Sequence, residues 1–325
     1  MKSSNRTWIG FDLGGTKMMA AVLDDKFRVI GARRRKTKGE AGSKVGVARL
    51  IETIDQALSD AKVPRSRLAG IGMGVPGMLD LDKGVLKLAP NLGWRDVPLR
   101  KALMQAFKVP VAIANDVDAG TYGEYRFGAA RRAHCVVGVF PGTGIGGGCI
   151  YEGRILRGKT GSCMEIGHVP VIRDGALCGC GRRGCLETVA SRLAISAELA
   201  QAVYRGEAPH LMRLAGTDIA NMRSGAIREA IQMGDRVVER IVRRAARQIG
   251  WVLIGTVHQL APDCIVLGGG LVEEMPKPFV EEVTDTLTKG VTDAFCGSFR
   301  VTAAKLGDYA TALGAAALAS DLVES

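Results

Sequence analysis

Four side chains that commonly bind metals lie close together in the middle of the chain. One histidine and three cysteines fall within the segment EIGHVPVIRDGALCGCGRRGCLE, namely His168, Cys178, Cys180 and Cys185. One imidazole nitrogen and three thiolates complete a tetrahedron around Zn²⁺ and leave no position for a reacting water. The segment therefore predicts a structural zinc site. A disulfide and buried free thiols are the alternatives.

The glycines and the remaining cysteines favour zinc over a disulfide. Gly179, Gly181 and Gly184 are expected to allow the tight backbone turns that bring the three thiolates to one point. The other five cysteines stand singly, outside the segment: Cys135, Cys149, Cys163, Cys264 and Cys296.

Three glycine-rich segments follow apolar stretches. DLGGTK at residues 12–17 and GTGIGGG at 142–148 are turns whose backbone N–H groups can approach phosphate oxygens, although plain hairpins are the alternative. The second turn matches GxGxxG, but a strand pattern follows it where a dinucleotide fingerprint requires a helix. No GxxxxGK[ST] sequence occurs, which excludes a P-loop. The third segment, 268–270, suits a nucleobase or ribose.

The first two turns lie in stretches of the same layout. Residues 7–34 and 133–158 each predict a strand, the glycine turn, a second strand, a polar turn and a third strand. This internal similarity predicts two related lobes.

Helical and strand patterns alternate around these stretches, which is typical of α/β lobes. We expect an N-terminal lobe at 1–115, with the helix of 308–325 packing back on it, and a C-terminal lobe at 116–307 that carries the cysteine segment. The cleft between the lobes is the expected ligand site. Helices are expected at 45–61, 99–107, 191–205, 235–260, from 276 and at 308–322, and strands at 68–74, 109–114 and 264–267.

Composition excludes several classes of protein. The longest apolar runs are too short to span a bilayer, and the N-terminus lacks a signal-peptide core, so a cytoplasmic protein is expected. The net charge of +11 and the basic clusters at 33–36, 131–132 and 240–247 raise the possibility of nucleic-acid binding. Because only 5% of residues are aromatic, we favour solvated basic faces and expect no nucleic-acid partner.

The three glycine segments, with the cysteine segment between the second and the third, resemble the ROK family of sugar kinases and sugar-responsive repressors. The resemblance covers nearly the whole chain, and its most specific part is CGCGRRGCLE preceded by EIGH. It implies an α/β fold of two actin-like (ribonuclease H-like) lobes with an interlobe active-site cleft. It also implies ATP and Mg²⁺ as cofactors, a structural Zn²⁺ and a homo-oligomer.

The resemblance assigns roles to individual residues, with Asp116 as the catalytic base. An N-cap is the alternative for Asp116, and solvated charge is the alternative for Glu165 and Glu187. The sugar would contact Asn91, Asn115, Asp116, Glu165, His168 and Glu187, with His168 also a zinc ligand. ATP would contact Asp12, Gly14, Gly15, Thr16, Lys17, Gly142, Thr143, Gly144, Gly146, Gly268 and Gly269.

The expected function is an ATP-dependent glucokinase that phosphorylates the 6-hydroxyl of glucose. The alternatives are an N-acetylglucosamine or N-acetylmannosamine kinase and a non-catalytic sugar-binding protein, and polyphosphate stays open as a phosphate donor. A repressor is disfavoured because only 11 residues precede Asp12, too few for a DNA-binding module. Met164 departs from the family, which usually has a small residue there.

Overall fold

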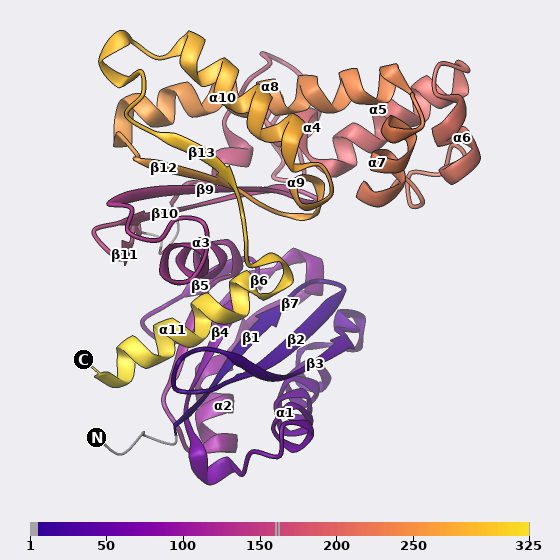
Figure 1. Cartoon of the computed structure of the whole chain (residues 1–325). Coiled ribbons are helices and arrows are strands. Elements are labelled where there is room, and N and C mark those ends of the chain that lie inside the picture. The colour runs from indigo at the N-terminus through magenta and orange to yellow at the C-terminus, as the bar shows by residue number, and fades with distance from the viewer. Residues whose placement is uncertain (1–5, 160, 162, 325) are drawn as a thin grey trace. The chain divides into compact units, whose positions relative to one another are not determined.

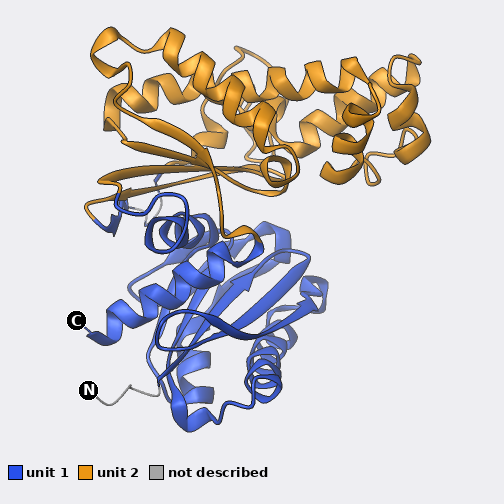
Figure 2. Cartoon of the chain, viewed as in Figure 1, with its two compact units in different colours: residues 1–132, 153–163, 308–325 blue, residues 133–152, 164–307 orange. Residues whose placement is uncertain are grey.

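The chain folds into two compact units. The computed structural model describes residues 6–159, 161 and 163–324. One unit comprises residues 1–132, 153–163 and 308–325, and the other comprises residues 133–152 and 164–307 (Figure 2). Each unit combines a sheet with helices, so the predicted α/β class is confirmed. The first unit continues past the boundary expected at residue 115.

A five-stranded sheet forms the centre of the first unit, in the order β3-β2-β1-β4-β8 (Figure 1). The neighbours β1, β2 and β3 are antiparallel, whereas β4 and β8 run parallel to β1. The strands are β1 Thr7–Leu13, β2 Lys17–Leu23, β3 Val29–Lys36, β4 Leu68–Val75 and β8 Val111–Asn115.

Large apolar side chains cover one face of this sheet. Ile9 and Phe11 of β1 are fully buried and belong to the same core cluster as Leu50 and Ile54 of α1 (Ser43–Asp60) and Leu103 of α2 (Leu99–Phe107). Since successive strand residues point to opposite faces, Gly10 and Asp12 face the other side.

The last helix, α11 (Ala310–Glu324), packs closely on that other side. A side chain at Gly10 would place its Cβ 1.9 Å from the carbonyl oxygen of Ala312, and one at Gly72 would come within 1.7 Å of Ala315 O. Glycine in the strands and alanine in the helix are what permit this approach. Gly314 brings α11 equally close to Ala119 of α3 (Asp116–Arg126), which is why α3 belongs to the first unit.

A second sheet of the first unit was not predicted. It is antiparallel in the order β5-β6-β7, formed by Met78–Asp80, Val85–Ala89 and Trp94–Val97. Strands of three to five residues show too few periods of alternation to stand out in a sequence.

The sheet of β9 to β13 repeats the topology of the first sheet. Its order is β11-β10-β9-β12-β13, with β9 and β10 antiparallel and β12 and β13 parallel to β9. The predicted duplication of the strand pattern is therefore confirmed. The strands are β9 Cys135–Pro141, β10 Ile145–Tyr151, β11 Arg154–Ile155, β12 Cys264–Leu267 and β13 Arg300–Ala303.

The helices of the second unit share one apolar core with its strands. The 25-residue α8 contributes Val238, Ile241, Ile249 and Leu253 to it. The expected helices at 191–205 and 235–260 correspond to α5 and α8, but α6 and α7 were not predicted. The helices are α4 Glu187–Ala190, α5 Arg192–Tyr204, α6 Pro209–Ala215, α7 Ser224–Gln232, α8 Arg236–Leu260, α9 Gly270–Glu274 and α10 Pro276–Gly290.

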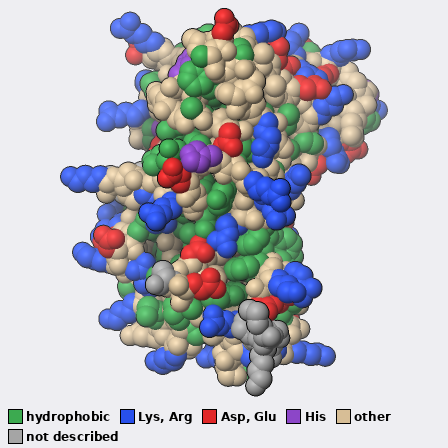
Figure 3. Space-filling view, turned by 60° about the vertical axis from the view of Figure 1, so that its left-hand side comes forward, with side chains coloured by type: hydrophobic (Ala, Val, Ile, Leu, Met, Phe, Trp, Pro, Cys, Tyr) green, Lys and Arg blue, Asp and Glu red, His purple; other side chains and the backbone are tan. Residues whose placement is uncertain are grey.

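Acidic partners accompany the basic clusters. In β3, Arg35 pairs with Glu52, and in α8 Arg243 and Arg247 both pair with Glu282 of α10. On the face seen in Figure 3, Lys and Arg side chains are scattered among acidic ones. Among the described residues, no helix is both long enough and apolar enough to cross a membrane.

Candidate functional site

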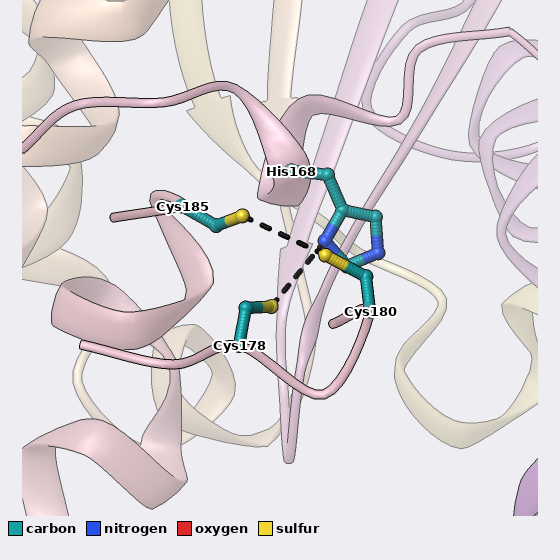
Figure 4. Close-up of side chains that lie close together, drawn as sticks. All are labelled: His168, Cys178, Cys180 and Cys185. Atoms are coloured by element: carbon teal, nitrogen blue, oxygen red, sulfur yellow. Dashed lines mark hydrogen bonds between the residues drawn. The ribbon is translucent and has the colours of Figure 1, made fainter. Parts of the chain in front are cut away.

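The four predicted metal ligands converge in the second unit. One ligand atom from each of His168, Cys178, Cys180 and Cys185 lies within 4.8 Å of all the others (Figure 4). The Sγ atoms of Cys180 and Cys185 are 3.7 Å apart, and Nδ1 of His168 is 3.6 Å from Sγ of Cys178. A tetrahedron with Zn–S bonds of about 2.3 Å has edges of roughly 3.8 Å, so the donor set and its spacing fit zinc.

Two tight turns bring these ligands together. Gly184 has a positive φ of 73°, and a Cβ there would lie 1.7 Å from the carbonyl oxygen of Ile172. Gly181 also has a positive φ, 84°, and donates its N–H to the carbonyl of Cys178. Gly179 has neither a positive φ nor a close neighbour, so the expectation that the turn requires glycine there is wrong.

All eight cysteines are free, which removes the disulfide alternative. Burial is the main reason that the pKa of the Cys178 thiol rises to about 12. A metal ion would have to displace that proton, since the thiolate is the ligand.

The first glycine turn is held by hydrogen bonds within the first unit. The N–H of Gly14 donates to the carbonyl of Lys17 at 2.9 Å, and the hydroxyl of Thr37 donates to the carbonyl of Gly14 at 2.7 Å. Gly15 lies against Asn91, because a Cβ at Gly15 would be 3.2 Å from Asn91 Cβ. Thr16 at the tip is exposed.

Two carboxylates lie close to this turn. Burial, followed by repulsion from Asp116, raises the pKa of Asp12 to about 7, and Lys17 partly opposes that rise. The ammonium of Lys17 is 3.3 Å from Asp308, and Arg34 is 2.7 Å from the same carboxylate. The sequence interpretation did not identify Asp308, although its position directly before the alanine-rich helix could have suggested it.

Asn115 and Asp116 lie where β8 ends and α3 begins. The side-chain oxygen of Asn115 accepts hydrogen bonds from the N–H groups of Val117 and Asp118, at 2.9 and 3.2 Å. Asn115 is therefore the N-cap, and Asp116 is the first residue of the helix. The capping oxygen is engaged, which leaves the NH₂ group of Asn115 as its donor toward a ligand.

The second glycine turn depends on residues far along the chain. Ile145 donates its N–H to the carboxylate of Glu187 at 3.0 Å, and Gly142 accepts a hydrogen bond of 2.8 Å from the N–H of Arg192. A Cβ at Gly144 would lie 2.3 Å from Glu187 Oε2, so only glycine leaves room for that carboxylate. Glu187 also accepts a hydrogen bond from the thiol of Cys178, at 3.4 Å.

Glu187 therefore lies between the predicted metal ligands and the second turn. The sequence interpretation made it a sugar ligand and missed its contact with Ile145. It also missed Arg192, whose guanidinium donates to the hydroxyl of Thr143 at 3.1 Å. Gly146, another predicted ATP contact, lies within β10.

The third glycine segment follows β12 and lies beside the end of β9. A Cβ at Gly268 would be 2.5 Å from the ring of Phe140, and Gly269 has a positive φ of 79° beside the carbonyl of Pro141. The predicted adenosine contacts are therefore next to the second glycine turn.

Glu165 and His168 lie on one short 3-10 helix, Ile166–His168, for which Glu165 is the N-cap. Nδ1 of His168 faces the sulfurs, whereas its other ring nitrogen points away from them (Figure 4). The exposed Glu165 and this nitrogen offer polar groups outside the metal cluster. Met164, directly before, has a positive φ of 58°, a conformation that favours glycine over a bulky side chain.

The predicted site residues thus form one group in each unit. Asp12, Gly14 to Lys17, Asn91, Asn115 and Asp116 lie in the first unit. Gly142 to Gly146, Glu165, His168, Glu187, Gly268 and Gly269 lie in the second unit.

Comparison with known proteins extends over almost the whole chain. The model of the family described as "ROK family" matches residues 8–322. A glucokinase of Thermotoga maritima is 32% identical over 319 residues, which cover 97% of this chain and 98% of the relative. A xylose repressor of Caldicellulosiruptor bescii is 29% identical and matches 83% of this chain and 67% of the repressor.

A solved structure of similar fold contains both a sugar and a nucleotide analogue. It is a ROK family glucokinase from Streptomyces griseus in complex with glucose and AMPPNP, with a TM-score of 0.85 and 30% sequence identity. The match covers 97% of this chain and 99% of that chain.

Proposed function

The chain belongs to the ROK family, and we propose that it is an ATP-dependent glucokinase that phosphorylates the 6-hydroxyl of glucose. The observation that carries this proposal is the placement of Asp116 at the end of β8, within the electrostatic reach of Asp12 in the first glycine turn. The first unit therefore contains both Asp116, the proposed proton acceptor for a sugar hydroxyl, and the proposed phosphate-binding turn. Full-length similarity to glucokinases supports glucose as the sugar.

We assign the proton transfer to Asp116. Its Oδ1 accepts a hydrogen bond of 3.0 Å from the N–H of Val117, which orients the carboxylate at the start of α3. Phosphoryl transfer needs positioning, charge stabilisation and an acceptor for the hydroxyl proton. Asp116 supplies the acceptor, and the NH₂ group of Asn115 can donate to a neighbouring sugar oxygen.

The remaining sugar contacts come from Asn91, Glu165, His168 and Glu187 in this proposal. A carboxylate accepts strong hydrogen bonds from hydroxyl groups, and the outward nitrogen of His168 can donate one. The N–H of Ile145 occupies Oε2 of Glu187 and holds the carboxylate in place. A sugar hydroxyl would therefore meet this carboxylate in a fixed position.

Zinc has a structural task here. When bound, it would cross-link His168, Cys178, Cys180 and Cys185 and so hold Glu165 and Glu187 at either end of the segment. Because four protein ligands would leave no position for a reacting water, the carboxylates would carry out the chemistry.

Mg²⁺ fits the first glycine turn on electrostatic grounds. The raised pKa of Asp12 reflects burial and the nearby charge of Asp116, and a divalent cation would offset both costs. When bound, Mg²⁺ neutralises part of the charge of the ATP phosphates. Asp12 is the residue that would hold it.

We also propose a homo-oligomer in the cytoplasm. The family resemblance supports the oligomer. Free thiols and the use of ATP support the cytoplasm. Light scattering on the purified protein tests the assembly, and a monomer at micromolar concentration would contradict it.

A coupled assay that follows ADP formation tests the kinase. We expect turnover with ATP and glucose that exceeds turnover with mannose, fructose, N-acetylglucosamine and N-acetylmannosamine. Equal rates on all five would refute the preference for glucose. Absence of ATP consumption with every sugar would refute the kinase and leave a sugar-binding protein. Inorganic polyphosphate in place of ATP tests the alternative donor.

A further inference from the structure

Arg192 holds an unusual position beside the second glycine turn. Its backbone N–H donates to the carbonyl of Gly142 at 2.8 Å, and its guanidinium donates to the hydroxyl of Thr143 at 3.1 Å. Its side chain therefore reaches the tip of the turn between β9 and β10, while its backbone fixes the start of α5 to the same turn.

The second glycine turn has no positively charged residue of its own, although a carboxylate lies beside it. The segment GTGIGGG contains no lysine or arginine, and the carboxylate of Glu187 lies against Gly144. A turn that binds phosphates next to a carboxylate needs a positive group to offset the repulsion.

Arg192 is not committed to a carboxylate. In the part of the chain that the structure describes, its guanidinium donates to a neutral hydroxyl, whereas Lys17 at the first turn is already paired with Asp308. The contact of the guanidinium with Thr143 is exposed, so the charge is accessible to a ligand from solvent. Its five N–H donors and fixed charge suit a phosphate group better than a hydroxyl.

We propose that Arg192 binds the terminal phosphates of the nucleotide donor and thereby selects triphosphates over monophosphates. This inference rests on the proposed function, because it takes the second turn to be a phosphate site. In the absence of donor, Thr143 holds the guanidinium close to the place where it acts. No bond is made or broken by Arg192, which stabilises charge through hydrogen bonds.

The test compares nucleotides that differ only in their phosphates. The affinities of AMP, ADP and a non-hydrolysable ATP analogue are measured by calorimetry for the wild-type protein and for Arg192→Ala and Arg192→Lys. In Arg192→Ala, we expect the affinity for the ATP analogue to fall about 10- to 100-fold, the loss expected for a hydrogen bond to a charged group, with glucose and AMP affinities unchanged. Arg192→Lys should restore part of the loss, because it keeps the charge and loses the planar fork.

Arg173→Ala is the matched control, since it removes the same charge from a side chain of the same unit that is 98% exposed. It should bind all three nucleotides as the wild type does. Equal losses for AMP and the ATP analogue in Arg192→Ala would indicate a structural role and overturn the inference. Unchanged affinity for the ATP analogue would overturn it as well.

The coupled assay, run on the same variants, separates this inference from the proposed function. If the wild-type protein phosphorylates glucose and Arg192→Ala does so with the same KM for ATP, only the role of Arg192 is refuted. If the wild-type protein binds no nucleotide, the proposed kinase is refuted, and the role of Arg192 with it.

Discussion

The hairpins β1–β2 and β9–β10 occupy the same place in two sheets of the same topology, yet they obtain their charged groups differently. The first hairpin carries Asp12 and Lys17 itself, and Asp308 and Arg34 complete the group. The turn of the second hairpin has no ionisable residue, and Glu187 and Arg192 contact it from 42 and 49 positions further along the chain.

This difference shows that two hairpins of the same topology can be suited to different roles. The charges of the first turn come from strand residues and from Asp308, and we propose proton transfer beside it. The second turn depends on a segment of irregular backbone, which the predicted metal cluster would make rigid. A metal ion is useful in the second unit because loops without regular hydrogen bonding hold side chains poorly by themselves.

Replacement of the proposed base, which lies within electrostatic reach of the first hairpin, should have the largest effect. In Asp116→Asn, turnover should fall about 10²- to 10⁴-fold, because the amide accepts no proton. Glucose binding should stay close to that of the wild type, since the hydrogen bond from Val117 can be kept. ADP formation and calorimetry with glucose measure the two quantities. Turnover within a few-fold of wild type would show that another group is the base.

Loss of a predicted metal ligand tests the second hairpin. Cys180→Ser should reduce the zinc content, lower glucose affinity roughly 10- to 100-fold and lower the thermal unfolding midpoint. Cys180 is exposed, so little packing is lost. Elemental analysis, calorimetry and thermal unfolding are the measurements.

Cys296→Ser is its control, because Cys296 is equally exposed and lies outside the cluster. It should match the wild type in all three measurements. If Cys180→Ser kept its zinc content and glucose affinity, the metal cluster would have no part in the second hairpin.

A single methyl group tests the contact between Glu187 and the second turn. Gly144→Ala places a Cβ 2.3 Å from Glu187 Oε2 and should displace the carboxylate from Ile145. We expect kcat/KM for ATP to fall roughly tenfold, which corresponds to about 1.4 kcal/mol. Gly255→Ala, in α8 with no neighbour within 4 Å, should have no such effect. Equal kinetics for both variants would contradict the coupling.

Stability as a function of pH tests the charges of the first hairpin by unfolding, without an activity measurement. The pKa of Asp12 is about 7 in the folded protein, above its ordinary value of 3.8. The folded state therefore binds more protons between these values, so stability falls as the pH rises from about 4 to 7. Asp12→Asn removes that loss and should raise the free energy of unfolding at pH 8 by about 1–2 kcal/mol, with little gain at pH 4.

Denaturant unfolding at both pH values measures this change. Asp174→Asn, at a carboxylate whose side chain is 91% exposed, should change stability equally at both. A gain in Asp12→Asn that is the same at pH 4 and pH 8 would mean that packing, and not the ionisation of Asp12, limits the first hairpin.

Much of the fold was predictable where the signal is local. The helix expected at 99–107 coincides with α2, and the strand expected at 264–267 coincides with β12. Long amphipathic periods and runs of buried apolar residues need no tertiary information. The short strands β5 to β7 and the helices α6 and α7 lacked such periods and were missed.

The metal cluster was predictable for a different reason. His168 and the three cysteines lie within 18 residues, and the chemistry of the donor set narrows what they can do. The prediction that glycine is required was correct at Gly184 and wrong at Gly179. A Cβ at Gly184 would collide with a carbonyl oxygen, whereas a Cβ at Gly179 would meet no atom within 4 Å.

The sequence by itself determined the duplicated strand pattern, the glycine turns and the set of metal ligands, since these depend on residue type and local spacing. Only the tertiary structure decided that Asp308 pairs with Lys17. The same holds for the contacts of Glu187 and Arg192 with the second turn. Such contacts join residues far apart in the chain, and their distances are set by how helices and strands pack, which no local pattern records.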